Sequence, residues 1–187
     1  MVSCQQTQMK QATNPDDIKN LYHQVLTAAD VSPDSAMLMV DSLRTNDLIP
    51  DYHADLMRAR IYTQSQDSML LDSAIIIGER LMTQDVMQTN LATRQDVLEM
   101  LITACRLHRD DEQTIHWSTQ LIDLCRQQGE ETEALRTETE VGLVLSYIGK
   151  ADEGLAKIDS VIHQLSSSLL RGDKRGASTR WMPASLP

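Results

Sequence analysis

The chain has 187 residues, of which 41% are hydrophobic, and carries a formal net charge of −10. Aromatic residues make up only 3% and Phe is absent, so aliphatic side chains must fill the interior, which favours helices over β-sheets. The negative charge argues against nucleic acid and anionic membrane surfaces as partners, because phosphate-rich surfaces are bound by basic faces.

Residues 1–14 are expected to form a flexible N-terminus with one candidate modification site. Val2 and Ser3 precede Cys4 in a way that resembles the end of a bacterial lipoprotein signal, which makes Cys4 a candidate for lipidation. The apolar run of such a signal does not stand before Cys4 in this sequence. Three explanations stay open: an upstream apolar segment, a replaced signal, or a chance cysteine near a cytoplasmic N-terminus. Contact with a membrane is expected only through a lipid anchor or through a transmembrane segment, and the sequence as given contains no such segment.

Helix start and stop signals recur through the following 150 or so residues. Asn14-Pro15 and Ser32-Pro33 place a capping side chain before a proline at the first helical position, and Gly129 and Gly149 suit the left-handed residue that ends a helix. These signals predict helices over residues 15–30, 33–46, 50–65, 68–85, 91–108, 111–128, 130–148 and 151–167. Consecutive helices pair into four hairpins.

A four-residue signature recurs at the start of the second helix of each hairpin. It begins at residues 34, 72, 112 and 152, which are 38, 40 and 40 residues apart. Its third position is small, as a close helix crossing requires, and holds Ala36, Ala74, Thr114 and Gly154. The next position holds Met37, Ile75, Ile115 and Leu155, and the position six further on holds Leu43, Leu81, Leu121 and Val161. This spacing predicts one apolar stripe per helix and a stacked helical repeat array.

The array resembles the tetratricopeptide repeat family, most closely in its fourth repeat. The residues that carry the resemblance are Val141-Gly142, Leu145, Gly149, Asp152 to Leu155, Ile158 and Val161. Ile102 replaces the family's first-helix glycine in the third repeat, and the period near 40 exceeds the usual ~34. The resemblance is to the divergent repeats of bacterial signalling proteins and implies an all-α fold, a right-handed α-solenoid of about four helix-turn-helix repeats over residues 15–168.

The resemblance also implies where a partner binds. In this family the first helices of successive repeats line a concave groove that holds a peptide or a partner's helix. Carried onto the third and fourth repeats, the groove positions are Glu99, Thr103, Arg106, Thr139, Leu143 and Ser146. Arg106 suits a carboxylate, although no second cation stands beside it to complete a basic clamp.

Catalysis is not expected, because no nucleophile can be paired by spacing with a general base and no phosphate-binding loop is present. The densest set of metal-ligand types, from His108 to His116, matches no established zinc spacing and suits a solvated turn. Cys105 and Cys125 are expected to be buried thiols, and Trp117 to pack between repeats or against the convex face. We therefore expect no enzyme activity, no metal and no cofactor.

Residues 169–187 break the pattern and are expected to be a disordered or truncated tail. A missing capping helix would leave Leu145, Ile158 and Ile162 exposed and favour self-association. The leading hypothesis is a protein-binding or peptide-binding scaffold, the extracytoplasmic sensor or interaction module of a bacterial signalling protein or lipoprotein, periplasmic or membrane-anchored. The alternative is a cytoplasmic adaptor or structural protein that binds a second copy of itself.

Overall fold

The computed structural model describes residues 15–65 and 67–170. Within these ranges all regular secondary structure is α-helical and no strand occurs, as the composition predicts. The chain divides into two compact units: unit 1 ends at Leu121 and unit 2 begins at Ile122. The division falls inside the helix α7 (Asp111–Gln128). The expected flexible N-terminus, residue Cys4 and the tail beyond Leu170 lie outside the described residues.

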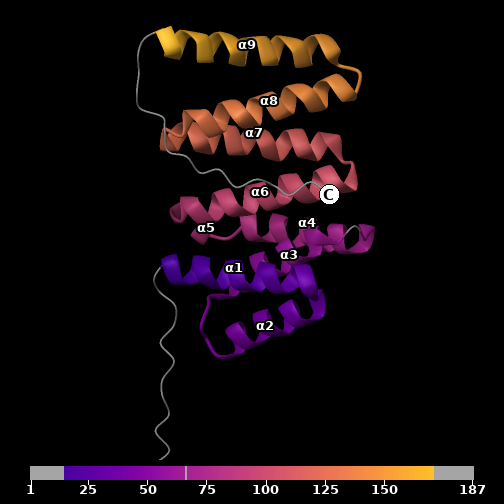
Figure 1. The fold of residues 1–187 in the computed structure, drawn as a ribbon, viewed down its shortest axis with the longest axis vertical. Coiled ribbons are helices and arrows are strands. Elements are labelled where there is room, and N and C mark those ends of the chain that lie inside the picture. Colours follow the sequence, from indigo (N-terminus) through magenta and orange to yellow (C-terminus); the bar gives the residue numbers. More distant parts are fainter. Residues whose placement is uncertain (1–14, 66, 171–187) are drawn as a thin grey trace, which may run out of the picture. The chain divides into compact units, whose positions relative to one another are not determined.

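Unit 1 is built from α-helices connected by short turns (Figure 1). They are α1 (Pro15–Val31), α2 (Pro33–Thr45), α3 (Asp51–Gln64), α4 (Ser68–Met82), α5 (Val86–Thr89), α6 (Leu91–His108) and the first part of α7. The helix α1 packs against α2 and α3, while α6 packs against α3 and α4. The helix bounds agree closely with those predicted from the capping signals, except that residues 68–85 form α4 followed by a turn and α5 is an additional short helix.

Of the two predicted capping residues, Ser32 is seen as a side-chain cap, and Asn14 lies outside the described residues. The Ser32 hydroxyl accepts a hydrogen bond from the Ser35 amide at 3.3 Å, directly before Pro33. Two further caps were not predicted: the Asp67 carboxylate accepts from the Met69 amide at 2.8 Å, and Asn90 accepts from the Thr93 amide at 3.1 Å. Each cap satisfies a backbone donor that the helix leaves without an intrahelical partner.

The small residues at the third position of the signature lie where helices pack closely. Ala36 and Ala74 are completely buried, and Thr114 is nearly so. In the last predicted repeat, Gly154 of α9 is buried against α8. These outcomes agree with the prediction that the third position of the recurring signature lies at a close helix contact.

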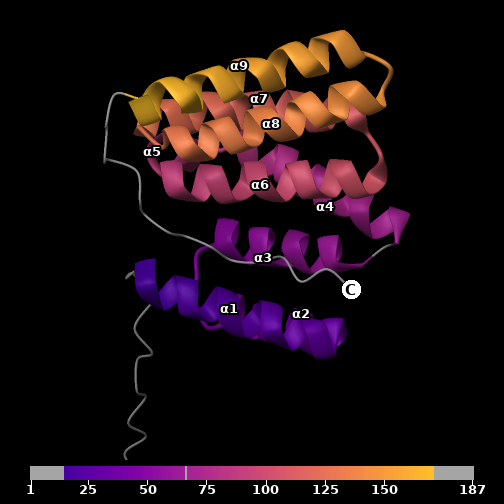
Figure 2. The ribbon, with the colours of Figure 1, turned by 45° about the horizontal axis from the view of Figure 1, so that its top comes forward.

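Unit 2 consists of the end of α7, the helix α8 (Glu131–Tyr147) and the helix α9 (Ala151–Leu170). Figures 1 and 2 both show α8 and α9 side by side, running in opposite directions after a tight turn. Gly129 and Gly149 have φ of +76° and +86°, which confirms their predicted left-handed helix ends. A side chain at Gly142 would touch Ile158, and one at Gly154 would touch Ser146 and the Gly142 carbonyl, so the two helices cross at two glycines.

Two expectations for unit 2 are wrong. Leu145 is buried, because it follows the buried Val141 by one turn on the inner face of α8. Leu155, placed in the core column, is instead 57% exposed. Ile158 and Ile162 were also expected to be exposed. Ile162 agrees with this prediction, since it is 55% exposed, whereas Ile158 is half-buried against Gly142.

Candidate functional site

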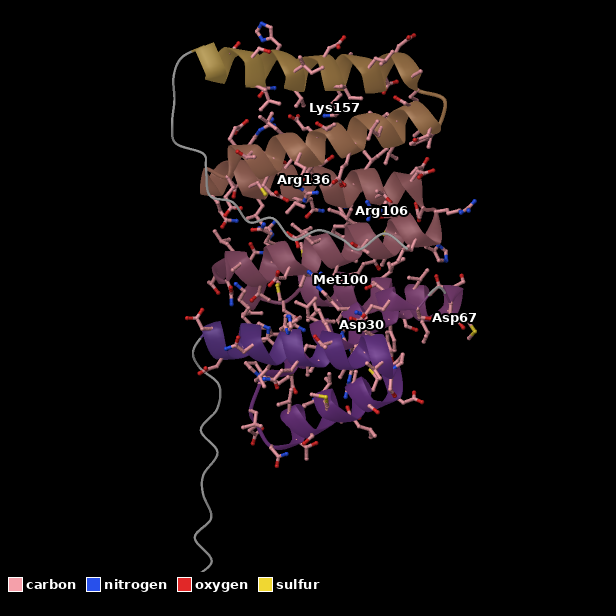
Figure 3. All side chains as sticks on the ribbon, in the orientation of Figure 1. Asp30, Asp67, Met100, Arg106, Arg136 and Lys157 are labelled. Atoms are coloured by element: carbon pink, nitrogen blue, oxygen red, sulfur yellow. The ribbon has the colours of Figure 1, made fainter. Side chains whose placement is uncertain are left out.

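The six predicted groove positions fall on two helices that belong to different units. Glu99, Thr103 and Arg106 lie on α6 of unit 1, where Figure 3 labels Arg106. Thr139, Leu143 and Ser146 lie on α8 of unit 2. Within each helix the three residues are spaced by four and then three positions, so each set shares one helix face.

On α6, the structure leaves Arg106 as the accessible group of the three. The Thr103 hydroxyl donates to the Glu99 carbonyl oxygen at 2.8 Å. The Glu99 carboxylate accepts from Gln95 and lies 3.6 Å from an Arg60 guanidinium nitrogen. Arg106 is exposed and makes no ion pair within residues 15–65 and 67–170.

On α8, the accessible group is Leu143. The Thr139 hydroxyl donates to the Leu135 carbonyl, and the Ser146 hydroxyl donates to the Gly142 carbonyl at 3.0 Å. Ser146 also lies against Gly154, so its side chain belongs to the crossing with α9. Leu143 is 47% exposed, and Tyr147, one turn later on the same face, is 87% exposed. The sequence interpretation missed Tyr147, although its spacing from Leu143 was available.

Four apolar residues of α9 form a second candidate surface, here called the α9 stripe and defined as Leu155, Ile158, Ile162 and Leu165; three of them are exposed and Ile158 is half-buried. Their spacings of three, four and three residues are those of a heptad seam, so the four side chains lie along one face. Leu155 and Ile162 are each more than half exposed, and Leu165 is 44% exposed. Gly154 and Val161 lie on the adjoining face of α9 and are buried.

The histidines of the predicted solvated turn have separate partners. His108 Nε2 lies 3.0 Å from an Asp72 carboxylate oxygen and 3.2 Å from the Ser68 hydroxyl. His116 Nε2 lies 3.0 Å from the Gln120 side-chain amide. Within the described ranges no three His, Cys, Asp or Glu residues come close enough to hold a metal ion.

A buried histidine, His53 of α3, lies beside two tyrosine rings. His53 stacks edge-on against Tyr22 of α1, with ring centroids 6.1 Å apart, and lies 4.5 Å from the ring of Tyr52. Burial lowers the pKa of His53 to about 4 and raises the pKa of Tyr22 well above 10. Both groups are therefore neutral at pH 7.

The two cysteines of the described chain, Cys105 and Cys125, are buried thiols, as predicted. Burial raises the pKa of the Cys105 thiol to about 12, and the nearby Asp110 and Glu79 carboxylates add to the increase. A thiol with such a pKa carries almost no thiolate at neutral pH and is a poor nucleophile.

No family model, curated protein or solved structure matches the chain. In the part of the chain that the structure describes, none of the helices is long and apolar enough to cross a membrane.

Proposed function

We propose that the chain is a non-catalytic scaffold that binds a protein or peptide partner through exposed helix faces. The observation that carries the proposal is the α9 stripe, since exposed apolar side chains that share a helix face are typical of interaction sites. A heptad-spaced seam suits a helical partner, because such a partner can insert its own side chains between those of the stripe.

The accessible faces of α6 and α8 support the same proposal. On α6, Arg106 offers a charged donor to a partner's carboxylate, and on α8, Leu143 with Tyr147 offers an apolar turn to a partner's apolar side chain. In the tetratricopeptide-like arrangement that the sequence resembles, these faces would line the concave side of a right-handed solenoid. That arrangement is part of the proposal.

We also propose a cellular setting for the chain. A bacterial sensor or interaction module outside the cytoplasm, anchored through lipidated Cys4, agrees with the lipoprotein-like start. Labelling of bacterial cells with an alkyne-bearing fatty acid tests the anchor: the native chain incorporates the label and Cys4→Ala does not. Equal labelling of both chains, or labelling of neither when the native coding region is expressed, contradicts it.

A second copy of the chain is the alternative partner, and the α9 stripe favours it because a heptad seam is self-complementary. Light scattering coupled to size exclusion distinguishes the two partners. A native dimer that becomes monomeric in Leu155→Glu, Ile162→Glu identifies self-association through α9.

A partner from another protein is tested by pull-down from bacterial envelope and cytosol extracts. We expect a partner that is retained by the native chain and lost with Leu155→Glu, Ile162→Glu. The matched control is Leu38→Glu, Ile76→Glu, which changes two similarly exposed apolar residues of unit 1. Loss with both pairs would indicate nonspecific adhesion and contradict a binding role for α9.

The α6 and α8 faces are tested in the same experiment with Arg106→Glu, Leu143→Glu. Ser146 is left unchanged, because a larger residue there would disturb the crossing with α9. Retention of the partner by this variant would restrict binding to α9. If the native chain neither dimerises nor retains any partner that the variants lose, the scaffold proposal is wrong.

A further inference from the structure

The α9 stripe continues onto the neighbouring helix of unit 2. The helices α8 and α9 run antiparallel and touch where Gly142 meets Gly154. Leu143 follows the first of these glycines by one position, and Leu155 follows the second. One position turns a side chain by about 100° around the helix axis, and in an antiparallel pair this turn leads to the same side. Leu143 and Leu155 therefore lie on one side of the α8 and α9 hairpin.

The other side of the hairpin is polar. Glu138 precedes Gly142 by four positions and Lys157 follows Gly154 by three, which turns both side chains the other way around their helices. There the Lys157 ammonium lies 3.6 Å from the Glu138 carboxylate. The exposed apolar side chains thus gather on one side of the pair. We call this surface the α8–α9 face and define it as the α9 stripe together with Leu143 and Tyr147.

Acidic side chains border this face along α9. When Leu155 and Ile162 are assigned to the a positions of a heptad, Asp152 and Asp159 occupy the e positions beside them. Both aspartates are exposed, and neither makes an ion pair within residues 15–65 and 67–170. The charges at such positions determine which partner helix is accepted.

The border along α8 is acidic as well. Glu133 and Glu140 flank Arg136, and its guanidinium pairs with both carboxylates. One positive and two negative charges leave −1 on this edge, and the two aspartates of α9 bring the border to −3. Lys150 lies in the turn between the two helices, and with it the balance is still −2.

Apolar surface and charge together decide which partner fits the α8–α9 face. A second copy of the chain would bring the same acidic border, so like charges would come together. A helix with lysine or arginine beside its apolar seam would instead place opposite charges next to the border.

We propose that the α8–α9 face binds an amphipathic, basic helix of another protein. The apolar residues of this partner recur at heptad spacing and pack on the α9 stripe, and its flanking lysine or arginine side chains pair with the acidic border. The inference rests on the proposed scaffold function, because it names the chemistry of the partner that the α9 stripe would bind.

The test uses the full chain and two synthetic helical peptides of equal length. Both have leucine at positions a and d and alanine or glutamine at b, c and f. The basic peptide has lysine at e and g, and the acidic peptide has glutamate there. Each is stapled on its outer face, labelled with fluorescein and used at nanomolar concentration in fluorescence anisotropy. We expect the basic peptide to bind, and the acidic peptide to bind at least about tenfold more weakly because like charges meet.

A scrambled basic peptide controls for simple attraction to a chain of net charge −10. It has the same composition as the basic peptide but no apolar seam, so it should bind about tenfold more weakly or less. Leu155→Glu, Ile162→Glu should weaken binding of the basic peptide by about tenfold or more, because the seam then meets charged side chains.

Reversal of the border tests the role of charge directly. Asp152→Lys, Asp159→Lys should make the acidic peptide the tighter ligand. The matched control is Asp34→Lys, Asp123→Lys, which changes the net charge equally at exposed aspartates of α2 and α7 and should leave the preference for the basic peptide in place.

Four results would overturn the inference: no binding of the basic peptide, equal affinity for the basic and acidic peptides, equal affinity for the basic and scrambled peptides, or equal effects of the two aspartate variants. A native dimer that the basic peptide does not dissociate counts as the first result and identifies a second copy as the occupant. A chain that dimerises or retains a partner through the α9 stripe, yet gives one of these results, keeps the scaffold function and loses only the basic helix as its partner. The comparison of the three peptides needs no variant of the chain.

Discussion

The crossing of α8 and α9 predicts that Gly154→Ala destabilises the protein, against the usual effect of this exchange. In a helix interior, alanine is favoured over glycine by about 1 kcal/mol. At Gly154, however, the new methyl group would lie closer than 3.0 Å to the Gly142 carbonyl oxygen and the Ser146 hydroxyl. Because the Gly142 contact is with backbone, the helices must separate. Overpacking of this kind costs about 1–3 kcal/mol, and with rigid backbone on the other side we expect the upper end.

The net expectation is a loss of about 2 kcal/mol in the free energy of unfolding, or about 10 °C in Tm for a small unit. Urea and thermal unfolding followed by far-UV circular dichroism measure it. Ala156→Gly, at an exposed position of α9, is the control for helix propensity alone and should cost about 1 kcal/mol. Propensity alone would make the two substitutions opposite in sign, whereas a tight crossing makes both destabilising. A higher midpoint for Gly154→Ala would refute the reasoning.

Three further predictions concern charged or ionisable groups. Because burial lowers the pKa of His53 to about 4, the unfolded chain binds a proton below about pH 6.5 that the folded protein does not bind. The free energy of unfolding should therefore fall by about 2 kcal/mol from pH 7 to pH 5. In urea unfolding at these two pH values, His53→Leu should make this decrease smaller. The Glu138 carboxylate lies 2.8 Å from Arg126 and 3.6 Å from Lys157. Glu138→Gln should therefore lower the free energy of unfolding, measured in urea, by about 1–2 kcal/mol. A change no larger than that caused by the same substitution at an exposed glutamate would count against these ion pairs. Since the pKa of Cys105 is raised to about 12, its alkylation by iodoacetamide at pH 8 should proceed only as the protein unfolds, and fast labelling of folded protein in a mass-spectrometric time course would contradict this.

Most of the helix boundaries could be predicted because they depend on interactions between residues that are close in sequence. The Ser32-Pro33 pair begins α2, and the left-handed Gly129 and Gly149 end helices, through interactions that span only a few residues. The break after Met82 was missed, because Thr83, Gln84 and Asp85 include neither glycine nor proline.

The environment of individual side chains was less predictable, because it depends on which helices lie beside them. Leu155 occupies the same repeat column as Ile75 and Ile115, which are half-buried, yet it is exposed because no helix among the described residues follows α9 to cover it. The sequence predicts Ser146 to be a groove residue, whereas in the structure it lies against Gly154 in the crossing of α8 and α9.

A pocket in unit 1, lined in part by Arg94 and Trp117, was not foreseeable for a related reason. Arg94 and Trp117 are 23 positions apart on different helices, and neither belongs to a recognisable motif. Within the described part of the chain the buried Arg94 Nε and Trp117 Nε1 atoms lack acceptors, which is a property of the assembled helices. The sequence identified Trp117 only as a residue that packs.

The α9 stripe has a consequence for how the protein behaves at different ionic strengths. With a net charge of −10, two copies repel each other over distances of a Debye length, which is about 30 Å at 0.01 M salt and about 8 Å at physiological ionic strength. Added salt screens this repulsion but leaves apolar contact between stripes intact. Association of copies through Leu155 and Ile162 would therefore strengthen as salt is added, opposite to an interface held by ion pairs, and a sample that is monomeric in dilute buffer would become dimeric at physiological ionic strength.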